Sequence, residues 1–309
     1  MNLRSIGILV TYRCNIECSH CYINCGPHRT GVLELDLAER ILRGAKDLGL
    51  DGSGIHVGGG ETFLYFDRVV EILGIAEQLD MTPLAWVETN CFWCKSDDIV
   101  RDRLTTLRDA GAGKIWLSTD PYHQEHVPFE NVKRIHRIGV EVLGEEGVIV
   151  QNQAYFESPE KWNDVADYIK SFPPMLMGRA YTELKRYRPR KPLAEFVSER
   201  CEDQISPEMM YETHINPDGS VMASNCSGVI VGDAEHRSLT DIFHDDDWCR
   251  NEVLRTLADK GPVGLLQMAR DFQQKETYAQ KCELCWEVRS HLAETIPDTF
   301  APVECYSGS

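Results

Sequence analysis

The sequence contains no run of about 18 consecutive apolar residues, the shortest length that suits a membrane-spanning helix. The apolar stretch near the N-terminus, residues 6–10, is too short to be the hydrophobic core of a signal peptide. These two absences argue against an integral membrane protein and a secreted one. We therefore expect a cytoplasmic protein without a membrane partner.

Positive charge is also scarce, because 32 Lys and Arg residues face 49 Asp and Glu residues, for a net charge of −17 over 309 residues. An acidic surface repels polyanions, so we expect no nucleic-acid partner. The one basic run, residues 185–191, contains Pro189 and precedes Pro192. We interpret residues 181–200 as a linker between two domains, with a site for an acidic peptide or a phosphate as the alternative use of the basic run.

Cysteine, by contrast, is abundant, with twelve residues. Because disulfides are rare in the cytoplasm, this number points to metal or redox chemistry. Cys14, Cys18 and Cys21 have the spacing C-x3-C-x2-C directly after a predicted strand. Zinc bound by four thiolates usually uses two separated cysteine pairs, whereas an iron–sulfur cube presents several irons to one loop. Three ligands for a four-iron cube leave one iron open. A zinc site closed by His20 or Cys25 is the alternative.

Apolar strands and amphipathic helices alternate over the first 180 residues. We expect strands at 5–10, 55–57, 83–88, 114–118, 140–150 and 175–177, and helices at 35–50, 65–79, 97–110, 131–138 and 159–172. Parallel neighbours need crossover helices, so six such alternations predict an α/β fold with a parallel sheet. Ligands in such folds collect at the C-terminal ends of the strands.

The cysteine spacing, the aromatic residue Tyr22 and the later run Gly58-Gly59-Gly60-Glu61 resemble the radical S-adenosylmethionine (radical SAM) superfamily. The resemblance implies a six-stranded partial (β/α)6 barrel over residues 1–180. It also implies a [4Fe–4S] cluster whose open iron binds S-adenosylmethionine (SAM) through its amino and carboxylate groups. An electron from a flavodoxin or ferredoxin then leads to a 5′-deoxyadenosyl radical, which abstracts hydrogen from an unactivated C–H bond.

The same resemblance implies that SAM is bound by groups that follow the strands. These groups are Gly58, Gly59, Gly60 and Glu61 after the second strand, Asn90 after the third, Ser118 and Asp120 after the fourth, Asn152 after the fifth and Arg179 after the last. Glu61 offers an acceptor for the SAM ammonium group. Ser118 and Asp120 match a Ser-x-Asp segment that contacts the ribose or carboxylate. Asn152 is expected at the ribose or adenine, and Arg179 at the carboxylate.

Three further residues are candidates for catalysis. Cys91 stands where the family usually has glycine, and with Cys94 it could donate a hydrogen atom to a substrate radical, form a redox pair or pack as a small apolar residue. His123 follows the fourth strand and could reach the substrate, or it could be a surface or capping residue. Cys305 could lie near the substrate or bind a metal.

The C-terminal third contains a second set of cysteines, Cys201, Cys226, Cys282 and Cys285. Between the first two, residues 211–216 and 220–224 predict a hairpin around the turn Pro217-Asp218-Gly219. This pattern resembles the SPASM/twitch extensions of radical SAM enzymes. The resemblance implies a small α+β domain over residues 201–309 with one auxiliary [4Fe–4S] cluster on the four cysteines. Structural zinc is the alternative, and Cys305 could replace Cys201 as a ligand.

By resemblance, SPASM/twitch enzymes mostly modify ribosomally made peptides by crosslinking, oxidation or epimerisation, and a minority oxidise small molecules. Because the first strand begins at about Ser5, we expect no leader-binding domain ahead of the barrel. We favour an oxidoreductase that modifies a peptide. Dehydrogenation or rearrangement of a small molecule is the second hypothesis. The hypothesis from another class is a non-enzymatic iron–sulfur or zinc protein.

Overall fold

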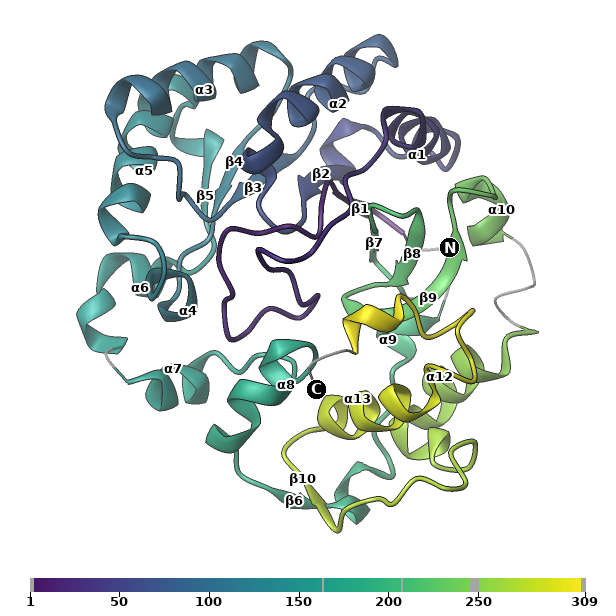
Figure 1. Ribbon diagram of the computed structural model, residues 1–309. Helices are drawn as coiled ribbons and strands as arrows, with labels where there is room; N and C mark the ends of the chain where they lie inside the picture. The colour runs from purple at the N-terminus through teal and green to yellow at the C-terminus, as the bar shows by residue number, and fades with distance from the viewer. Residues whose placement is uncertain (1–2, 163, 207, 245–249, 307–309) are drawn as a thin grey trace.

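One mixed β-sheet organises the molecule (Figure 1). The structure is a computed structural model that describes residues 3–162, 164–206, 208–244 and 250–306. The sheet order is β5-β4-β3-β2-β1-β7-β8-β9. The strands of this sheet are β1 (Ser5–Leu9), β2 (Ile55–Gly58), β3 (Trp86–Thr89), β4 (Ile115–Leu117), β5 (Val148–Val150), β7 (Glu212–Ile215), β8 (Ser220–Ala223) and β9 (Cys226–Asp233). A separate antiparallel pair joins β6 (Lys191–Pro192) to β10 (Thr277–Tyr278).

Six neighbouring strands, β5-β4-β3-β2-β1-β7, run parallel, and β8 and β9 continue the sheet antiparallel. The predicted α/β class with a mostly parallel, partial-barrel sheet is confirmed. The sixth parallel strand is β7, however, and residues 175–177 form no strand. The backbone N–H of Leu176 donates instead to the side chain of Gln280 (2.7 Å). Leu176 is thus hydrogen-bonded to a residue 104 positions along the chain and not to a neighbouring strand.

Helices cross between the parallel strands and cover the outer face of the sheet (Figure 1). The longer ones are α1 (Leu35–Asp47), α2 (Phe66–Gln78), α3 (Asp97–Asp109), α5 (Phe129–Leu143), α12 (Glu252–Leu265) and α13 (Lys281–Leu292). The shorter ones are α4 (Pro121–Gln124), α6 (Gln153–Glu157), α7 (Val165–Ser171), α8 (Arg179–Leu184), α9 (Glu202–Ile205) and α10 (Leu239–His244). Within the described ranges, no helix combines the length and apolarity that crossing a bilayer requires.

Helix α5 shows how a local pattern misled the sequence prediction. Residues 140–143 were expected to begin a strand, but the helix continues through Leu143. It stops at Gly144, whose φ of 83° suits glycine and ends a helix. Strand β5 therefore starts only at Val148. The division of the chain near residues 180 and 201 stays a prediction, since β7–β9 extend the same sheet as β1–β5.

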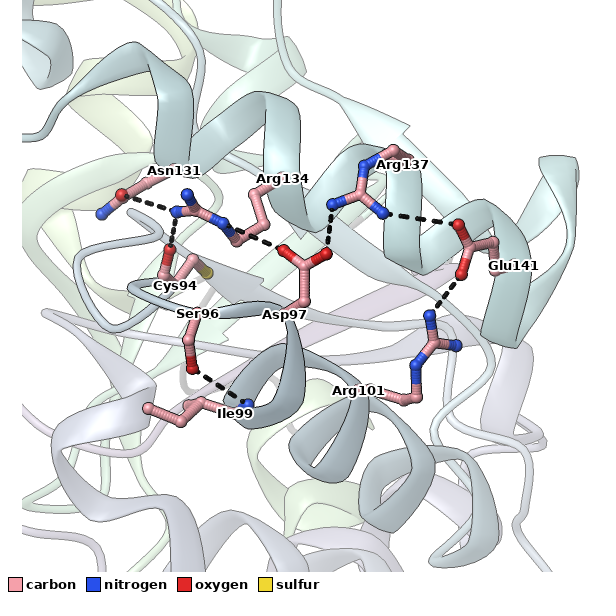
Figure 2. A network of polar contacts seen from close by, with 9 residues as sticks. All are labelled: Cys94, Ser96, Asp97, Ile99, Arg101, Asn131, Arg134, Arg137 and Glu141. Atoms are coloured by element: carbon pink, nitrogen blue, oxygen red, sulfur yellow. Dashed lines mark hydrogen bonds and ion pairs between the residues drawn. The ribbon is translucent and has the colours of Figure 1, made fainter.

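A network of ion pairs joins α3 to α5 (Figure 2). Asp97 binds Arg134 (Oδ1–Nε, 3.2 Å) and Arg137 (Oδ2–Nη2, 2.7 Å). Arg137 also pairs with Glu141 (3.5 Å), and Arg134 donates to the carbonyl of Cys94 (2.6 Å). The two helices therefore hold the loop that follows β3, which contains predicted site residues.

Replacing Asp97 by Asn should lower the melting temperature slightly, and the loss should shrink in 1 M NaCl because exposed ion pairs are screened. Hydrogen bonds from Arg137 and Arg101 lower the pKa of the Asp97 and Glu141 carboxyls, respectively. This stabilisation is present above the unfolded pKa values, near 4, and is lost as pH falls through the lower folded values. Thermal melts at low and high salt test this. Asp102→Asn, on the exposed side of α3, is the matched control. An equal loss at both salt concentrations would contradict an electrostatic origin.

Candidate active site

The cysteine loop after β1 and the neighbouring strands enclose a cavity of about 400 Å3. In Figure 1 this loop, in dark purple, lies between the sheet and the C-terminal helices. Side chains from β1, β2, β3, β4 and β7 line the cavity, together with the cysteine loop and Arg179 of α8. A ligand that binds at the C-terminal ends of the strands would therefore occupy this cavity.

The three predicted cluster ligands, Cys14, Cys18 and Cys21, all lie on the cavity wall, and none is in a disulfide. Cys25 also reaches the wall, and its backbone N–H donates to Cys21 Sγ (3.3 Å). Hydrogen bonding with Cys25 lowers the pKa of the Cys21 thiol, whereas burial raises the pKa of Cys14 to about 12. One thiol is thus readily ionised, while Cys14 needs a cation to become a thiolate.

Arg179 holds the cysteine loop in shape. Its backbone N–H donates to the carbonyl of Cys21 (3.0 Å), and its Nε donates to the carbonyl of Cys18 (3.0 Å). Its Nη2 donates to the carbonyl of Cys25. The predicted role of Arg179 at the SAM carboxylate stays a prediction, and the contacts present are all with the loop.

The run of glycines after β2 packs directly on the cysteine loop. A Cβ on Gly60 would lie 2.1 Å from the carbonyl oxygen of Arg13, and Gly59 has a φ of 139°. The N–H groups of Gly60 and Glu61 donate to Thr11 (2.7 Å) and Arg13 (3.0 Å) carbonyls. Glycine is needed here because the two backbones touch.

Glu61 turns its carboxylate into the protein rather than onto the cavity wall. It is 1% exposed and accepts hydrogen bonds from Phe63 N–H (3.1 Å), Thr89 Oγ1 (2.8 Å) and Asn90 N–H (2.7 Å). Burial raises the pKa of Glu61 to about 7. Its observed contacts join the glycine run to the end of β3, and the ammonium contact stays a prediction. Gly58 lies beneath Glu88, since a Cβ there would be 2.8 Å from Glu88 Oε2.

Asn90 and Cys91, two predicted site residues at the end of β3, lie in different surroundings. Asn90 lines the cavity and donates to Asn15 Oδ1 (2.9 Å) and Cys14 Sγ (3.6 Å). Cys91 is fully buried in the core, as is Cys94. Cys91 adopts a φ of 67°, the left-handed conformation that explains a usual glycine at this position. Its burial supports the packing alternative over a catalytic thiol.

The end of β4 contributes a buried carboxylate and two imidazoles. Asp120 accepts from His123 Nδ1 (2.9 Å) and lies 3.6 Å from His20 Nε2. Burial lowers the pKa of His123, but Asp120 and Cys18 raise it more, so the pKa lies well above its usual value. Burial lowers the pKa of His20 to about 4. His123 and Ser118 reach the cavity wall, while Asp120 positions His123.

One group of three side chains bears on the zinc alternative. Cys18, His20 and His123 place possible ligand atoms within 4.8 Å of one another. The zinc hypothesis with His20 is therefore sterically reasonable, and metal analysis must separate it from an iron–sulfur cluster.

After β5, the cavity residue is Gln151 rather than the predicted Asn152. Asn152 caps α6 by accepting from Tyr155 N–H (3.0 Å), and it donates to Tyr168 Oη (2.7 Å). Gln151 lines the cavity and accepts from Thr119 N–H (3.0 Å). A predicted role for Asn152 in contacting SAM would need this cap to open.

Residues 8–143 match the family model of the Radical SAM superfamily. The match covers less than half of the chain, so it shows the similarity of this segment to the superfamily. Among curated proteins, it is 32% identical over 133 residues to the "Probable GTP 3′,8-cyclase" of Methanothermobacter marburgensis, which covers 41% of this chain and 38% of that protein. The chain thus spans well under half of that relative.

Two solved structures resemble the fold at low identity. BtrN in complex with AdoMet and 2-DOIA is 14% identical, with 84% of this chain and 89% of that one covered and a TM-score of 0.50. Native anSMEcpe with bound AdoMet is 12% identical, with 95% and 98% covered and a TM-score of 0.47. The first similarity supports the fold assignment.

The four C-terminal cysteines lie close enough to influence one another's ionisation. Burial, together with the neighbouring thiols, raises the pKa of Cys201 to about 12 and of Cys282 to about 11. Burial also raises the pKa of Cys226 well above its usual value, with Cys201, Cys282 and Cys285 contributing. A cation at their centre would offset this cost of ionisation.

Two residues that support this second set, Arg289 and Ser227, were not predicted from sequence. Arg289, one turn after Cys285 on α13, is 1% exposed and donates to Ser227 O (2.8 Å) and Tyr306 Oη (3.3 Å). Ser227 Oγ donates to the carbonyl of Tyr22 (2.5 Å). The i, i+4 spacing of Cys285 and Arg289 was the available signal.

Cys305 lies elsewhere. It is buried, and its carbonyl accepts from Asn24 Nδ2 (2.9 Å). Burial raises the pKa of its thiol to about 11, with Arg29 acting against this and Asp218 adding to it. These neighbours belong to the cysteine loop and the hairpin turn, so ligation by Cys305 stays a prediction.

Four residues inside the sheet also line the cavity and were missed by the sequence analysis: His56, Glu88, Glu212 and His214. They come from three strands, so no local motif groups them. The available signal was a histidine inside the short apolar strand β2.

Proposed function

We propose that the chain is a radical SAM oxidoreductase that binds a [4Fe–4S] cluster on Cys14, Cys18 and Cys21 and modifies a substrate held in the cavity. The observation that carries this proposal is the position of all three thiols on one cavity wall. Asn90 and Arg179 support it, because they fix the loop through the side chain of Asn15 and the backbone carbonyl of Cys18.

The donor set fits the family's cofactors. When bound, the cluster and SAM supply an electron and a 5′-deoxyadenosyl radical that abstracts hydrogen from a C–H bond. The chain's own residues orient the ligands: Gly59 and Gly60 line the cavity without side chains, and Ser118 and Gln151 offer polar side chains. His123 donates its Nδ1–H to Asp120 and also interacts with Cys18 of the loop. The walls limit solvent access to reactive species.

For the substrate we propose a ribosomally made peptide that inserts one side chain, to be crosslinked, oxidised or epimerised. A small polar molecule is the second candidate, and the enclosed cavity with His56, Glu88 and Glu212 on its wall favours it. The auxiliary cluster on Cys201, Cys226, Cys282 and Cys285 would accept an electron in a net oxidation. A flavodoxin or ferredoxin is the proposed electron donor. Mass spectrometry of a precursor peptide encoded beside this gene, incubated with the enzyme, distinguishes the two substrate classes.

Anaerobic reconstitution with iron and sulfide, followed by dithionite and SAM, tests the reaction. We expect 5′-deoxyadenosine and about eight irons per chain if both cysteine sets hold cubes, or about four if one does. Samples without dithionite are the control. Zinc in place of iron, with no 5′-deoxyadenosine, would contradict the enzyme proposal.

Cys25→Ser is the matched variant for the open iron. Cys25 is on the wall beside Cys21 but outside the proposed ligand triad. The variant should keep its iron and its SAM cleavage. Loss of one cluster in this variant would make Cys25 a ligand and leave no position for SAM.

A further inference from the structure

We propose that His56, His214 and Glu212 form a site for a divalent transition-metal ion inside the barrel, separate from both cysteine sets. The site lies on the cavity wall, within the sheet, whereas the cysteine loop lies beyond the strand ends. This inference goes beyond the proposed radical reaction and does not depend on it.

The sheet register brings the two imidazoles together across a glycine. Gly7 of β1 pairs with His56 of β2 on one side and with His214 of β7 on the other. A Cβ on Gly7 would lie 2.5 Å from His56 Nε2 and 2.3 Å from His214 Cδ2. Both rings therefore occupy the space above Gly7, with centroids 5.3 Å apart. Any other residue at position 7 would push them apart.

Glu212 completes the group because it precedes His214 by two residues and so faces the same side of β7. Its Oε1 lies 3.9 Å from His56 Nε2 and 4.0 Å from His214 Nε2. These separations are too long for hydrogen bonds. All three ligand atoms nevertheless lie within 4.8 Å of one another. Metal–ligand bonds of about 2.1 Å place adjacent ligand atoms roughly 3 to 3.4 Å apart, so small side-chain rotations would enclose an ion.

The hydrogen bonding of His214 prepares its Nε2 for a metal. Nδ1 lies 3.3 Å from the carbonyl oxygen of Ser224. Because a carbonyl only accepts, Nδ1 carries the proton and Nε2 presents its lone pair to Glu212 and His56. A backbone carbonyl on the far nitrogen is the usual support of a metal-bound histidine.

His56 supplies the second imidazole of the proposed site. The residue is 2% exposed, and its Nδ1 has no hydrogen-bond partner among the described residues. Its ring stacks on Trp86 (centroids 4.6 Å apart, planes at 12°), which fixes its orientation. Its Nε2 lies 3.9 Å from the carboxylates of Glu212 and Glu88, so this nitrogen is the one turned toward the proposed ion.

Glu88 supplies a second carboxylate, 3.9 Å from His56 Nε2. It accepts from Trp86 Nε1 (3.1 Å), and Gly58 leaves room for it. Two imidazoles with one or two carboxylates suit Mn2+, Fe2+ or Zn2+ better than Mg2+ or Ca2+, which prefer oxygen alone. Since the cluster opens onto the cavity, such an ion would have positions left for a carboxylate or hydroxyl group of a substrate.

Titration with Mn2+, followed by the electron paramagnetic resonance signal of the free ion, tests the site. The reconstituted holoenzyme is used with its cubes in the oxidised, diamagnetic state. We expect one Mn2+ bound per chain in addition to the iron. His56→Gln, His214→Gln and Gly7→Ala should each weaken binding at least about tenfold. Gly7→Ala is informative because it removes no ligand atom.

His236→Gln is the matched control, since His236 is exposed and lies 3.8 Å from the Asp233 carboxylate. It should bind Mn2+ like the wild type. If a histidine variant fails to fold, as judged by circular dichroism and iron content, Glu212→Gln replaces it. Absence of Mn2+ binding to the wild type, or equal binding by all variants, would overturn the proposal. The measurement needs no turnover, so it is independent of SAM cleavage.

Discussion

Replacing Cys18 by alanine should reduce 5′-deoxyadenosine formation to the level of protein without a cluster, and reduce iron from about eight to about four per chain. Cys18 is buried on the cavity wall between two other thiols of the same loop. Two thiolates cannot hold a cube and keep one iron open for SAM. Cys14→Ala and Cys21→Ala should behave alike. Iron analysis and chromatography of the SAM products measure both effects.

Cys94→Ala is the control, because Cys94 is equally buried but lies in the core. It should keep both iron and SAM cleavage. His20→Gln distinguishes the zinc hypothesis, since His20 has a ligand atom close to those of Cys18 and His123. If His20→Gln lost the metal while Cys14→Ala kept it, the metal would be bound by Cys18, His20 and His123 rather than as a cube.

Replacing Arg289 by methionine should release the auxiliary metal, lowering iron to about four per chain, and should lower the melting temperature. Arg289 is fully buried, and burial lowers its pKa while Tyr306 and the thiols of Cys285 and Cys226 raise it more. Its charge therefore compensates a thiolate-bound centre. Removing one partner of a buried ion pair costs about 3–5 kcal/mol. SAM cleavage at the first cluster should remain.

Arg289→Lys keeps the charge and should retain part of the iron. Arg200→Met is the matched control, since Arg200 adjoins Cys201 but is exposed and donates to Val197 O. The Arg200→Met variant should retain all of its iron. Full iron and an unchanged melting temperature in Arg289→Met would show that the arginine only packs against Tyr306.

The sequence predicted features that depend on neighbouring residues. The cysteine loop after the first strand, the glycine run after the second and the hairpin around Asp218 are all set by local chemistry, and the structure has the corresponding loop, glycine contacts and strands. The alternation of strands and helices likewise predicted the α/β class. Within this alternation, the extent of α5 was misjudged, because residues 140–143 fit a strand as well as a helix.

Features that depend on distant partners were not predictable. Residues 175–177 are as apolar as a strand, but β7 takes the place beside β1. Side-chain direction decided that Gln151, and not Asn152, reaches the cavity, and that Glu61 faces inward. His56 and His214 meet only because β2 and β7 both pair with Gly7, 49 and 207 positions away.

The hydrogen bond from Ser227 to the carbonyl of Tyr22 joins neighbours of Cys226 and Cys21. If both thiol sets hold clusters, charge leaving one centre has a short through-bond path to the other and needs no diffusing carrier between them. The two clusters would then exchange electrons within one polypeptide, and one docked reductant would supply both.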